Sequence, residues 1–198
     1  MIICENLLFS HGAEVHNYKS SEYIFREEGT PKHYLQIKSG KVKLSSFLED
    51  GKEFIHGIPF DGHCFAETYL FHDRKYAVNA IAVTNCEIIK LEKQKLIELL
   101  LKKPELILNL YSYTAERMHY RYLTSASFSF KDPITKLNLI MNHLKTLFGF
   151  EDRFSFLIPY TRQQLASLTG MRIETVIRAI KKMEKQDIIK IDNSKIYI

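Results

Sequence analysis

The chain has 198 residues, 45% of them hydrophobic, which is ordinary for a globular protein of one large domain or two small ones. Its three cysteines are odd in number and lack metal-like spacing, which indicates a reducing compartment. The N-terminus has no basic flank and no apolar run approaches about 18 residues, so we expect a cytoplasmic protein with neither a signal peptide nor a membrane span.

The positive charge is concentrated near the C-terminus. Residues 131–198 contain twelve Lys and Arg against seven Asp and Glu, whereas residues 1–130 contain sixteen of each. The whole net charge of +5 therefore lies in the last third of the chain, where it can attract a polyanion such as DNA. The alternative is a basic face that is simply solvated.

Four glycines recur every eleven residues near the N-terminus: Gly29, Gly40, Gly51 and Gly62. Three of them follow Ser or Asp in turn-forming dipeptides, and segments of alternating polarity lie between them. These segments are 33–38, 41–47 and 53–60, and two further strands are expected at 76–83 and 87–91. The pattern predicts a compact β-roll over about the first ninety residues.

Helical patterns follow from residue 92. The stretch EKQKLIELLLKK consists of helix formers and ends before Pro104, which begins a second helix that extends to about Ser125. A series close to a heptad runs along this second helix: Ile107, Tyr111, Thr114, Met118, Arg121 and Ser125. We expect the helix to pair with its own copy in a dimer. The alternative is a helix packed on its own β-roll.

A new helix begins near residue 132, which places a domain boundary near residues 129–131. Asp132 suits the N-cap, Pro133 suits the first helical position, and Gly149 suits the position after the helix end. One apolar stripe is expected to face the core: Ile134, Leu137, Ile140 or Met141, Leu144 and Leu147.

The stretch 161–189 would form one long helix except for Gly170. Thr161 and Gln164 match a capping box that starts a short helix, and Gly170 supplies the backbone freedom for a tight turn into a second helix. Together these segments predict a helix-turn-helix. The final residues, IIKIDNSKIYI, predict two short strands around Asp192-Asn193-Ser194, a hairpin of the kind called a wing.

The second helix of this pair, residues 171–186, has two opposite faces at about 100° per residue. The core face is predicted to carry Ile173, Val176, Ile180 and Met183, and the outer face Glu174, Arg178, Lys181 and Lys182. Ile177 lies near the border between the faces, which is unusual for a solvated helix but acceptable for one that meets a surface.

Glu174 and Arg178 have two interpretations. They can form an i,i+4 ion pair worth about 0.2–0.5 kcal/mol on an exposed helix. In a major groove, a carboxylate at this spacing can instead accept from cytosine N4 while the guanidinium binds guanine O6 and N7. Their place early in the second helix of a helix-turn-helix, within the basic part of the chain, favours DNA.

The sequence resembles the Crp/Fnr family of bacterial transcription regulators over nearly its whole length. The resemblance is most specific in LTGMRIETVIRAIKKMEKQDII, where the family's Glu-Thr-Val/Ile-x-Arg motif matches Glu174, Thr175 and Arg178. A preceding position that often holds a second arginine is Ile173 here, with Arg172 one residue earlier. The base preference of the cyclic-AMP type of regulator therefore does not transfer to this chain.

The resemblance implies an α+β fold: an N-terminal β-roll of the jelly-roll-like or double-stranded β-helix kind, a long dimerisation helix and a C-terminal winged helix-turn-helix. The β-roll, which resembles a cyclic-nucleotide-binding domain, is expected at 1–103, the dimerisation helix and hinge at 104–130, and the winged helix-turn-helix at 131–198. The family also implies a homodimer on palindromic double-stranded DNA, with RNA polymerase as a further partner.

Two sets of residues are expected to contact DNA. Base contacts are expected from Glu174, Arg178, Thr175 and Arg172. Phosphate contacts, which provide affinity and salt dependence, are expected from Thr161, Arg162, Lys181, Lys182 and Lys195.

The family's nucleotide pocket matches the chain less well. Its cassette runs Phe-Gly-Glu-Leu, a loop and then Arg-Ser/Thr-Ala, and the corresponding stretch is FAETYLFHDRKYAVNAIA. Glu67 keeps the place of the ribose-binding glutamate, but Tyr76 and Ala77 replace the arginine and the hydroxyl residue, which removes a charge-assisted contact to phosphate. Arg74 or Lys75 can substitute if the loop is shorter. The candidate effector pocket comprises Glu67, Thr68, Arg74, Tyr76 and Ala77, and we expect no cofactor and not cyclic AMP as effector.

The competing class is a cupin-like metal-dependent enzyme or a small-ligand-binding protein. His56, His63, Glu67 and His72 provide metal-binding side chains, but the close His-x-His pair of such a site is missing. No nucleophile triad, phosphate loop or paired carboxylates are evident, so we predict no catalytic residues and no metal site. Cys4, Cys64 and Cys86 are too scattered for an iron–sulfur cluster.

Overall fold

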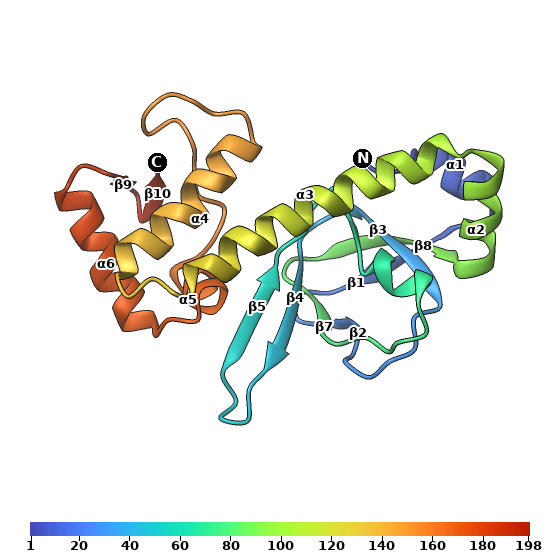
Figure 1. The fold of residues 1–198 in the computed structure, drawn as a ribbon, viewed down its shortest axis with the longest axis horizontal. Coiled ribbons are helices and arrows are strands. Elements are labelled where there is room, and N and C mark those ends of the chain that lie inside the picture. Colours follow the sequence, from blue (N-terminus) through green and yellow to red (C-terminus); the bar gives the residue numbers. More distant parts are fainter. The chain divides into compact units, whose positions relative to one another are not determined.

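The computed structural model describes residues 1–198, apart from the side chain of Ser127. The chain divides into two compact units, Met1–Glu116 and Arg117–Ile198 (Figure 1). Helix α3 (Glu105–Ser127) continues from the first unit into the second. Among the described residues, no helix combines the length and apolar character needed to cross a bilayer.

The first unit contains the predicted β-roll. Its elements are α1 (Glu5–Ser10), β1 (Glu14–Tyr18), β2 (Tyr23–Phe25), β3 (His33–Ser39), β4 (Val42–Phe47), β5 (Glu53–Gly57), β6 (Cys64–Phe65), a 3-10 helix η1 (Glu67–Phe71), β7 (Asn79–Ala82), β8 (Cys86–Glu92) and α2 (Lys93–Lys102). The strands form two four-stranded antiparallel sheets, in the orders β1-β8-β3-β6 and β2-β7-β4-β5. Figure 1 shows β4 and β5 extending from this roll as a hairpin. The predicted α+β fold class is confirmed.

The turn glycines behave as their spacing predicts. Gly40, Gly51 and Gly62 have φ values of 105°, 78° and 81°, a region that favours glycine. At Gly40 a Cβ atom would also lie only 2.5 Å from the carbonyl oxygen of Asn85, so no other residue fits without movement of the backbone. Gly51 lies in a hairpin between the paired strands β4 and β5, whereas Gly40 and Gly62 lie where the chain passes from one sheet to the other.

One predicted strand is shorter than expected. The segment 76–83 contains a strand only at Asn79–Ala82, because Tyr76 pairs with an irregular loop instead of a neighbouring strand. Its amide donates to the carbonyl of Gly29 at 3.0 Å, and its carbonyl accepts from the amide of Glu28 at 2.8 Å. The side chain of Tyr76 therefore enters the roll from a loop.

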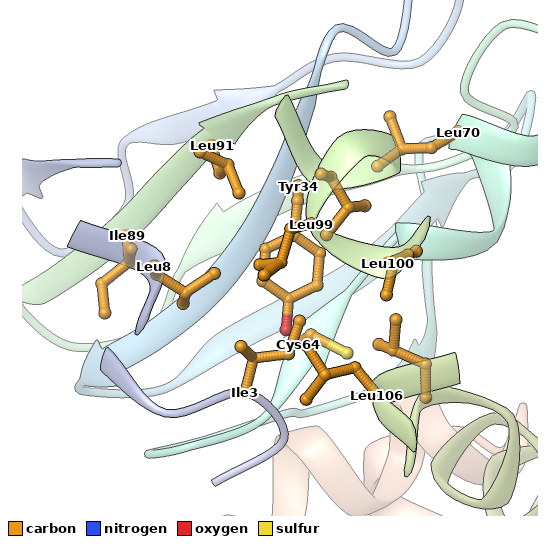
Figure 2. Packing of buried hydrophobic residues seen from close by; sticks show 12 residues of the cluster. Ile3, Leu8, Tyr34, Cys64, Leu70, Ile89, Leu91, Leu99, Leu100 and Leu106 are labelled. Atoms are coloured by element: carbon orange, nitrogen blue, oxygen red, sulfur yellow. The ribbon is translucent and has the colours of Figure 1, made fainter. Parts of the chain in front are cut away.

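A buried cluster around Tyr34 joins the sheet to the helices at one end of the roll. Figure 2 shows Tyr34 at its centre, with Ile3 and Cys64 near its hydroxyl end. The hydroxyl donates to Gln36 Oε1 at 2.7 Å, and the same oxygen accepts from the amide of Ile3 at 3.0 Å. Burial raises the pKa of Tyr34 well above its usual value. Leu106 of α3 also belongs to this cluster, so the start of α3 is fixed to the roll.

The second unit contains the predicted winged helix-turn-helix. After the end of α3 follow α4 (Pro133–Leu147), α5 (Arg162–Thr169), α6 (Ile173–Lys185), β9 (Lys190–Asp192) and β10 (Lys195–Tyr197). The core includes buried residues of the three helices: Leu137, Ile140, Met141, Leu144, Leu165, Leu168, Val176, Ile180 and Met183. The Asp132 side chain caps α4 by accepting from the amide of Thr135 at 2.9 Å, as the sequence predicts. Leu147 was expected on the core stripe but is exposed, because it is the last helical residue before the chain turns at Gly149.

Candidate nucleic-acid interface

Helix α5 begins with the predicted capping box. The Thr161 hydroxyl accepts from the amide of Gln164 at 3.1 Å, and the Gln164 side chain accepts from the amide of Thr161 at 2.9 Å. Each bond satisfies an amide that the first turn of a helix leaves without a partner. The start of α5 is therefore defined by residues within one turn of each other.

The turn between α5 and α6 depends on Gly170. This residue has φ 67° and ψ 13°, the left-handed conformation that ends helices. The amide of the next residue, Met171, donates back to the carbonyl of Ala166 at 3.0 Å. Ala166 is itself buried, so the turn closes directly over α5. The interruption of the helical pattern at residue 170 is thus the turn of the helix-turn-helix.

Helix α6 is divided into two faces, as its periodicity predicts. Val176, Ala179, Ile180 and Met183 are buried, and Glu174, Arg178, Lys181 and Lys182 are exposed. Ile173 was expected in the core but is only half-buried, because it is the first helical residue and lies next to the turn. The exposed face carries one acid and three bases.

Glu174 and Arg178 do not pair with each other. Neither side chain makes an ion pair or hydrogen bond with any residue that the structure describes. A carboxylate and a guanidinium are thus presented together on one exposed face, four residues apart. Both groups retain their full hydrogen-bonding capacity for an external partner.

Arg172 and Thr175 lie at the start of α6. Arg172 is the N-cap residue, and its exposed side chain makes no capping hydrogen bond. Arginine is an uncommon choice there, because Ser, Thr, Asp and Asn can accept from the free amides of the first turn. Thr175 is half-buried, one residue beyond Glu174. The positions at the N-terminal end of α6 are therefore not optimised for helix stability alone.

The wing is a tight hairpin next to α5. Asn193 and Ser194 both have positive φ, at 48° and 65°, which is typical of a two-residue hairpin turn. The guanidinium of Arg162 donates to the carbonyl of Ser194 at 3.1 Å and so joins α5 to the wing. Lys195 is exposed on β10. The expected phosphate-binding residues of α5 and the wing thus lie close together.

Helix α3 exposes an apolar stripe. Its members follow a 3-4 spacing: Leu108, Tyr111, Ala115, Met118 and Tyr122. Tyr111 is 74% exposed and Met118 is 49% exposed, which is high for large apolar side chains. The buried contacts of α3 with the roll come from other positions, among them Leu106 and Leu110. One face of the helix therefore packs on the roll and another is left uncovered in the single chain.

The exposed stripe shares only Tyr111 and Met118 with the expected seam, and it has Leu108 and Tyr122 in place of Ile107 and Arg121. The clearest departure is at Thr114. Its hydroxyl donates to the Glu67 carboxylate at 3.2 Å, so it faces the roll and not the exposed stripe. One residue earlier, the Tyr113 hydroxyl donates to the carbonyl of Cys64 at 3.0 Å. The exposed stripe passes through Ala115 instead, because these two hydroxyls are directed at the roll.

Sequence reasoning missed the contact residues Tyr113 and Thr114. Leu106, Leu110 and Tyr113 follow a 4-3 spacing of their own, parallel to the exposed stripe, and this spacing indicates a second apolar face of α3. The Thr114–Glu67 bond has no such signal, because it joins positions 47 residues apart.

Glu67 is deeply buried in the candidate effector loop. It begins the 3-10 helix η1, is 2% exposed, and accepts from Thr114. A buried carboxylate requires hydrogen-bond donors, and one of them is supplied by the chain's own α3. Thr68, Arg74 and Ala77 of the same candidate set are exposed.

Tyr76 fills the space beside this loop with an aromatic ring. It is 5% exposed, and its ring stacks on Phe25 with 3.7 Å between centroids. Tyr69 lies edge-on at 5.4 Å from Tyr76, and its hydroxyl accepts from the amide of Ala77 at 3.2 Å. Burial raises the pKa of Tyr76 to about 12. The structure thus joins Tyr76 and Ala77 to an aromatic cluster.

The histidines of the alternative metal site have separate partners. His56 is hydrogen-bonded to Ser46 at 2.9 Å, and the ring of His63 lies 4.1 Å from that of Phe60. His72 accepts from the amide of Arg74 at 3.1 Å. Within the part of the chain that the structure describes, no three His, Cys, Asp or Glu side chains are grouped as a metal site.

Comparison with known proteins decides the family. A family model described as a cyclic nucleotide-binding domain matches residues 15–103, and one described as a Crp-like helix-turn-helix domain matches residues 139–198. The nitrogen fixation regulation protein FixK of Bradyrhizobium diazoefficiens is 30% identical over 190 residues, which cover 92% of this chain and 77% of FixK. This chain belongs to the Crp/Fnr family.

Other proteins of this family are similar to the chain over similar lengths. The cAMP-activated global transcriptional regulator CRP of Haemophilus influenzae is 27% identical over 179 residues, which cover 88% of this chain and 79% of CRP. The structure of FixK2 from Bradyrhizobium japonicum has the same fold, with a TM-score of 0.78 at 18% identity, covering 94% of this chain and 92% of that one.

Membership of the Crp/Fnr family indicates the general function of this chain. The chain is a DNA-binding transcription regulator, as the sequence predicts. Regulators of this family act as dimers, and control by an effector is typical of them. The family is one of transcription regulators.

Proposed function

We propose that this Crp/Fnr regulator binds a palindromic DNA site as a homodimer, with helix α6 of each copy in a major groove. A two-fold dimer presents two identical recognition helices, so it selects two half-sites about one helical turn apart, roughly 34–36 Å. Such a protein acts in the bacterial cytoplasm, where RNA polymerase is its expected further partner. It needs no catalytic residues.

The exposed pair Glu174 and Arg178 carries this proposal. The two side chains project from the same face of α6, and neither is engaged by a residue of the described structure. A carboxylate can accept from the amino group of cytosine, and a guanidinium can donate two parallel hydrogen bonds to guanine. Each good contact of this kind contributes about 1–3 kcal/mol of discrimination against the wrong base.

The other DNA contacts divide into two classes. Arg172 and Thr175 flank Glu174 and would add base contacts at the N-terminal end of α6. Phosphate contacts would come from the start of α5, the outer face of α6 and the wing: Thr161, Arg162, Lys181, Lys182 and Lys195. These positive charges favour DNA of any sequence, whereas the base contacts select one sequence.

The dimer would form through the exposed stripe of α3. Leu108, Tyr111 and Met118 lie at a/d-type spacing, and such residues pack between two helices of a coiled coil. Burying them against a second copy removes from water the apolar surface that the single chain exposes.

The β-roll would regulate without cyclic AMP. The relatives named CRP are cAMP-activated, but at the place of their phosphate-binding arginine this chain has Tyr76, whose ring is buried against Phe25. A neutral aromatic side chain cannot supply the charge-assisted contact that a cyclic phosphate needs. Any effector of the pocket around Glu67, Thr68, Arg74, Tyr76 and Ala77 would therefore be another small molecule.

Selection of binding sites from a random duplex pool, with purified protein and no added effector, tests the proposal. Recovery of a palindrome with half-sites one helical turn apart is the expected result. Recovery of no consensus, with only weak and salt-sensitive binding, would overturn the proposed readout.

A further inference from the structure

Ile177 is an aliphatic residue at the border between the two faces of the recognition helix. At about 100° per residue it lies roughly 80° from the direction shared by Glu174 and Arg178, and on the opposite flank from Thr175. It is half-buried, whereas Val176 and Ile180 on the adjoining core face are buried. Ile177 is therefore not needed to complete the core of the domain.

Helix stability does not explain an isoleucine at this position either. A β-branched residue has lower helix propensity than Lys, Glu or Gln, which suit a partly exposed helix position. Isoleucine also has no donor or acceptor, so it makes no hydrogen bond to a phosphate or a base edge. Its side chain offers an external partner only an apolar surface.

We infer that Ile177 reads the 5-methyl group of a thymine beside the base pairs read by Glu174 and Arg178. This inference rests on the proposed function. In the major groove the thymine methyl group is the apolar feature of the base-pair edge, and aliphatic side chains contact it. Ile177 is three residues after Glu174 and directly before Arg178, so it enters the groove together with them. Each half-site then contains a T·A pair next to the two hydrogen-bonded pairs.

Replacement of thymine by uracil in the selected operator tests the inference, because it removes the methyl group and leaves the base-pairing edge unchanged. With the unmodified protein, a symmetric thymine-to-uracil change at one position of each half-site should weaken binding about three- to tenfold. Ile177→Ala should bind the thymine operator more weakly by a similar factor and should lose nothing further on the uracil operator. Ile177→Val, which keeps a branched apolar side chain, should retain most of the thymine preference.

Lys182→Ala is the matched control on the same helix. It should weaken binding to both operators equally and leave the thymine-to-uracil ratio unchanged, since a phosphate contact does not sense the methyl group. An Ile177→Ala protein that keeps the full uracil penalty would overturn the inference, and so would a palindrome without a thymine at these positions or without any uracil penalty. Failure to recover any specific duplex would overturn the proposed readout as well. This outcome distinguishes failure of the proposed function from failure of the thymine inference alone.

Discussion

The ring of Tyr76 stacks on the ring of Phe25, with 3.7 Å between the centroids and 15° between the planes. The resemblance to the Crp/Fnr family implies that Tyr76 takes the place of an arginine of the cyclic-AMP type. The stack buries a large aromatic surface at the place where a phosphate would need a positive charge.

Cyclic AMP should not stabilise the protein. A ligand at 100 times its dissociation constant raises the free energy of unfolding by about 2.7 kcal/mol, which a thermal melt detects easily. We expect the same melting temperature with and without cyclic AMP, and the same affinity for the selected operator. A rise in either quantity would show that the loop can accept the nucleotide despite Tyr76.

Tyr76→Phe should change how stability depends on alkaline pH. Burial raises the pKa of Tyr76 to about 12 from a usual value of about 10, so the unfolded chain ionises first as the pH rises. The neutral Tyr76 hydroxyl contributes fully to the free energy of unfolding below pH 10, and this contribution is lost between pH 10 and about 12. Across this pH range the free energy of unfolding of the variant, measured by urea unfolding, should rise relative to that of the wild type by up to about 3 kcal/mol. Parallel stability curves would contradict the buried position of the hydroxyl.

Thr114→Val should weaken the attachment of α3 to the roll. The change removes the hydroxyl that donates to the buried Glu67 carboxylate at 3.2 Å, and leaving a buried acceptor short of a donor costs about 1–3 kcal/mol. Urea unfolding measures this loss. Thr114→Ser keeps the hydroxyl and is the control. Equal stability of both variants would mean that the bond contributes nothing.

Arg178→Ala should reduce the discrimination between the operator and random DNA. Loss of a bidentate contact to guanine removes about 1–3 kcal/mol from specific binding and little from non-specific binding. Lys182→Ala should weaken both kinds of binding about equally and lower the salt dependence by about one phosphate contact. Fluorescence anisotropy with the operator and a random duplex, at several salt concentrations, distinguishes the effects of the two variants. Unchanged discrimination in Arg178→Ala would refute its role in base readout.

Tyr111→Glu together with Met118→Glu should convert the dimer to a monomer. The change places two like charges on the exposed stripe of α3, where an interface between helices would bury them unpaired. Sedimentation should show the monomer, and operator affinity should fall because one recognition helix reads only one half-site. Asn109→Glu, an exposed position off the stripe, should remain dimeric. A dimeric double variant would place the interface elsewhere.

The recognition helix and its surroundings could be predicted from the sequence because their signals are local. The capping box of Thr161 and Gln164, the turn at Gly170 and the two faces of α6 each depend on residues within a few turns of one another. The glycines at 40, 51 and 62 mark β-turns for the same reason. Local conformational preference determines these features before any distant contact forms.

Only the tertiary structure determined the contacts of the β-roll and of α3. The sequence placed Thr114 on the dimer seam, but the fold directs it to Glu67, and it places Tyr76 against Phe25 although 50 residues separate them in the chain. Which of two neighbouring apolar stripes on α3 meets the roll depends on what the roll presents there, including the Cys64 carbonyl. Such contacts join segments that approach each other only after the sheets have formed, so no local pattern encodes them.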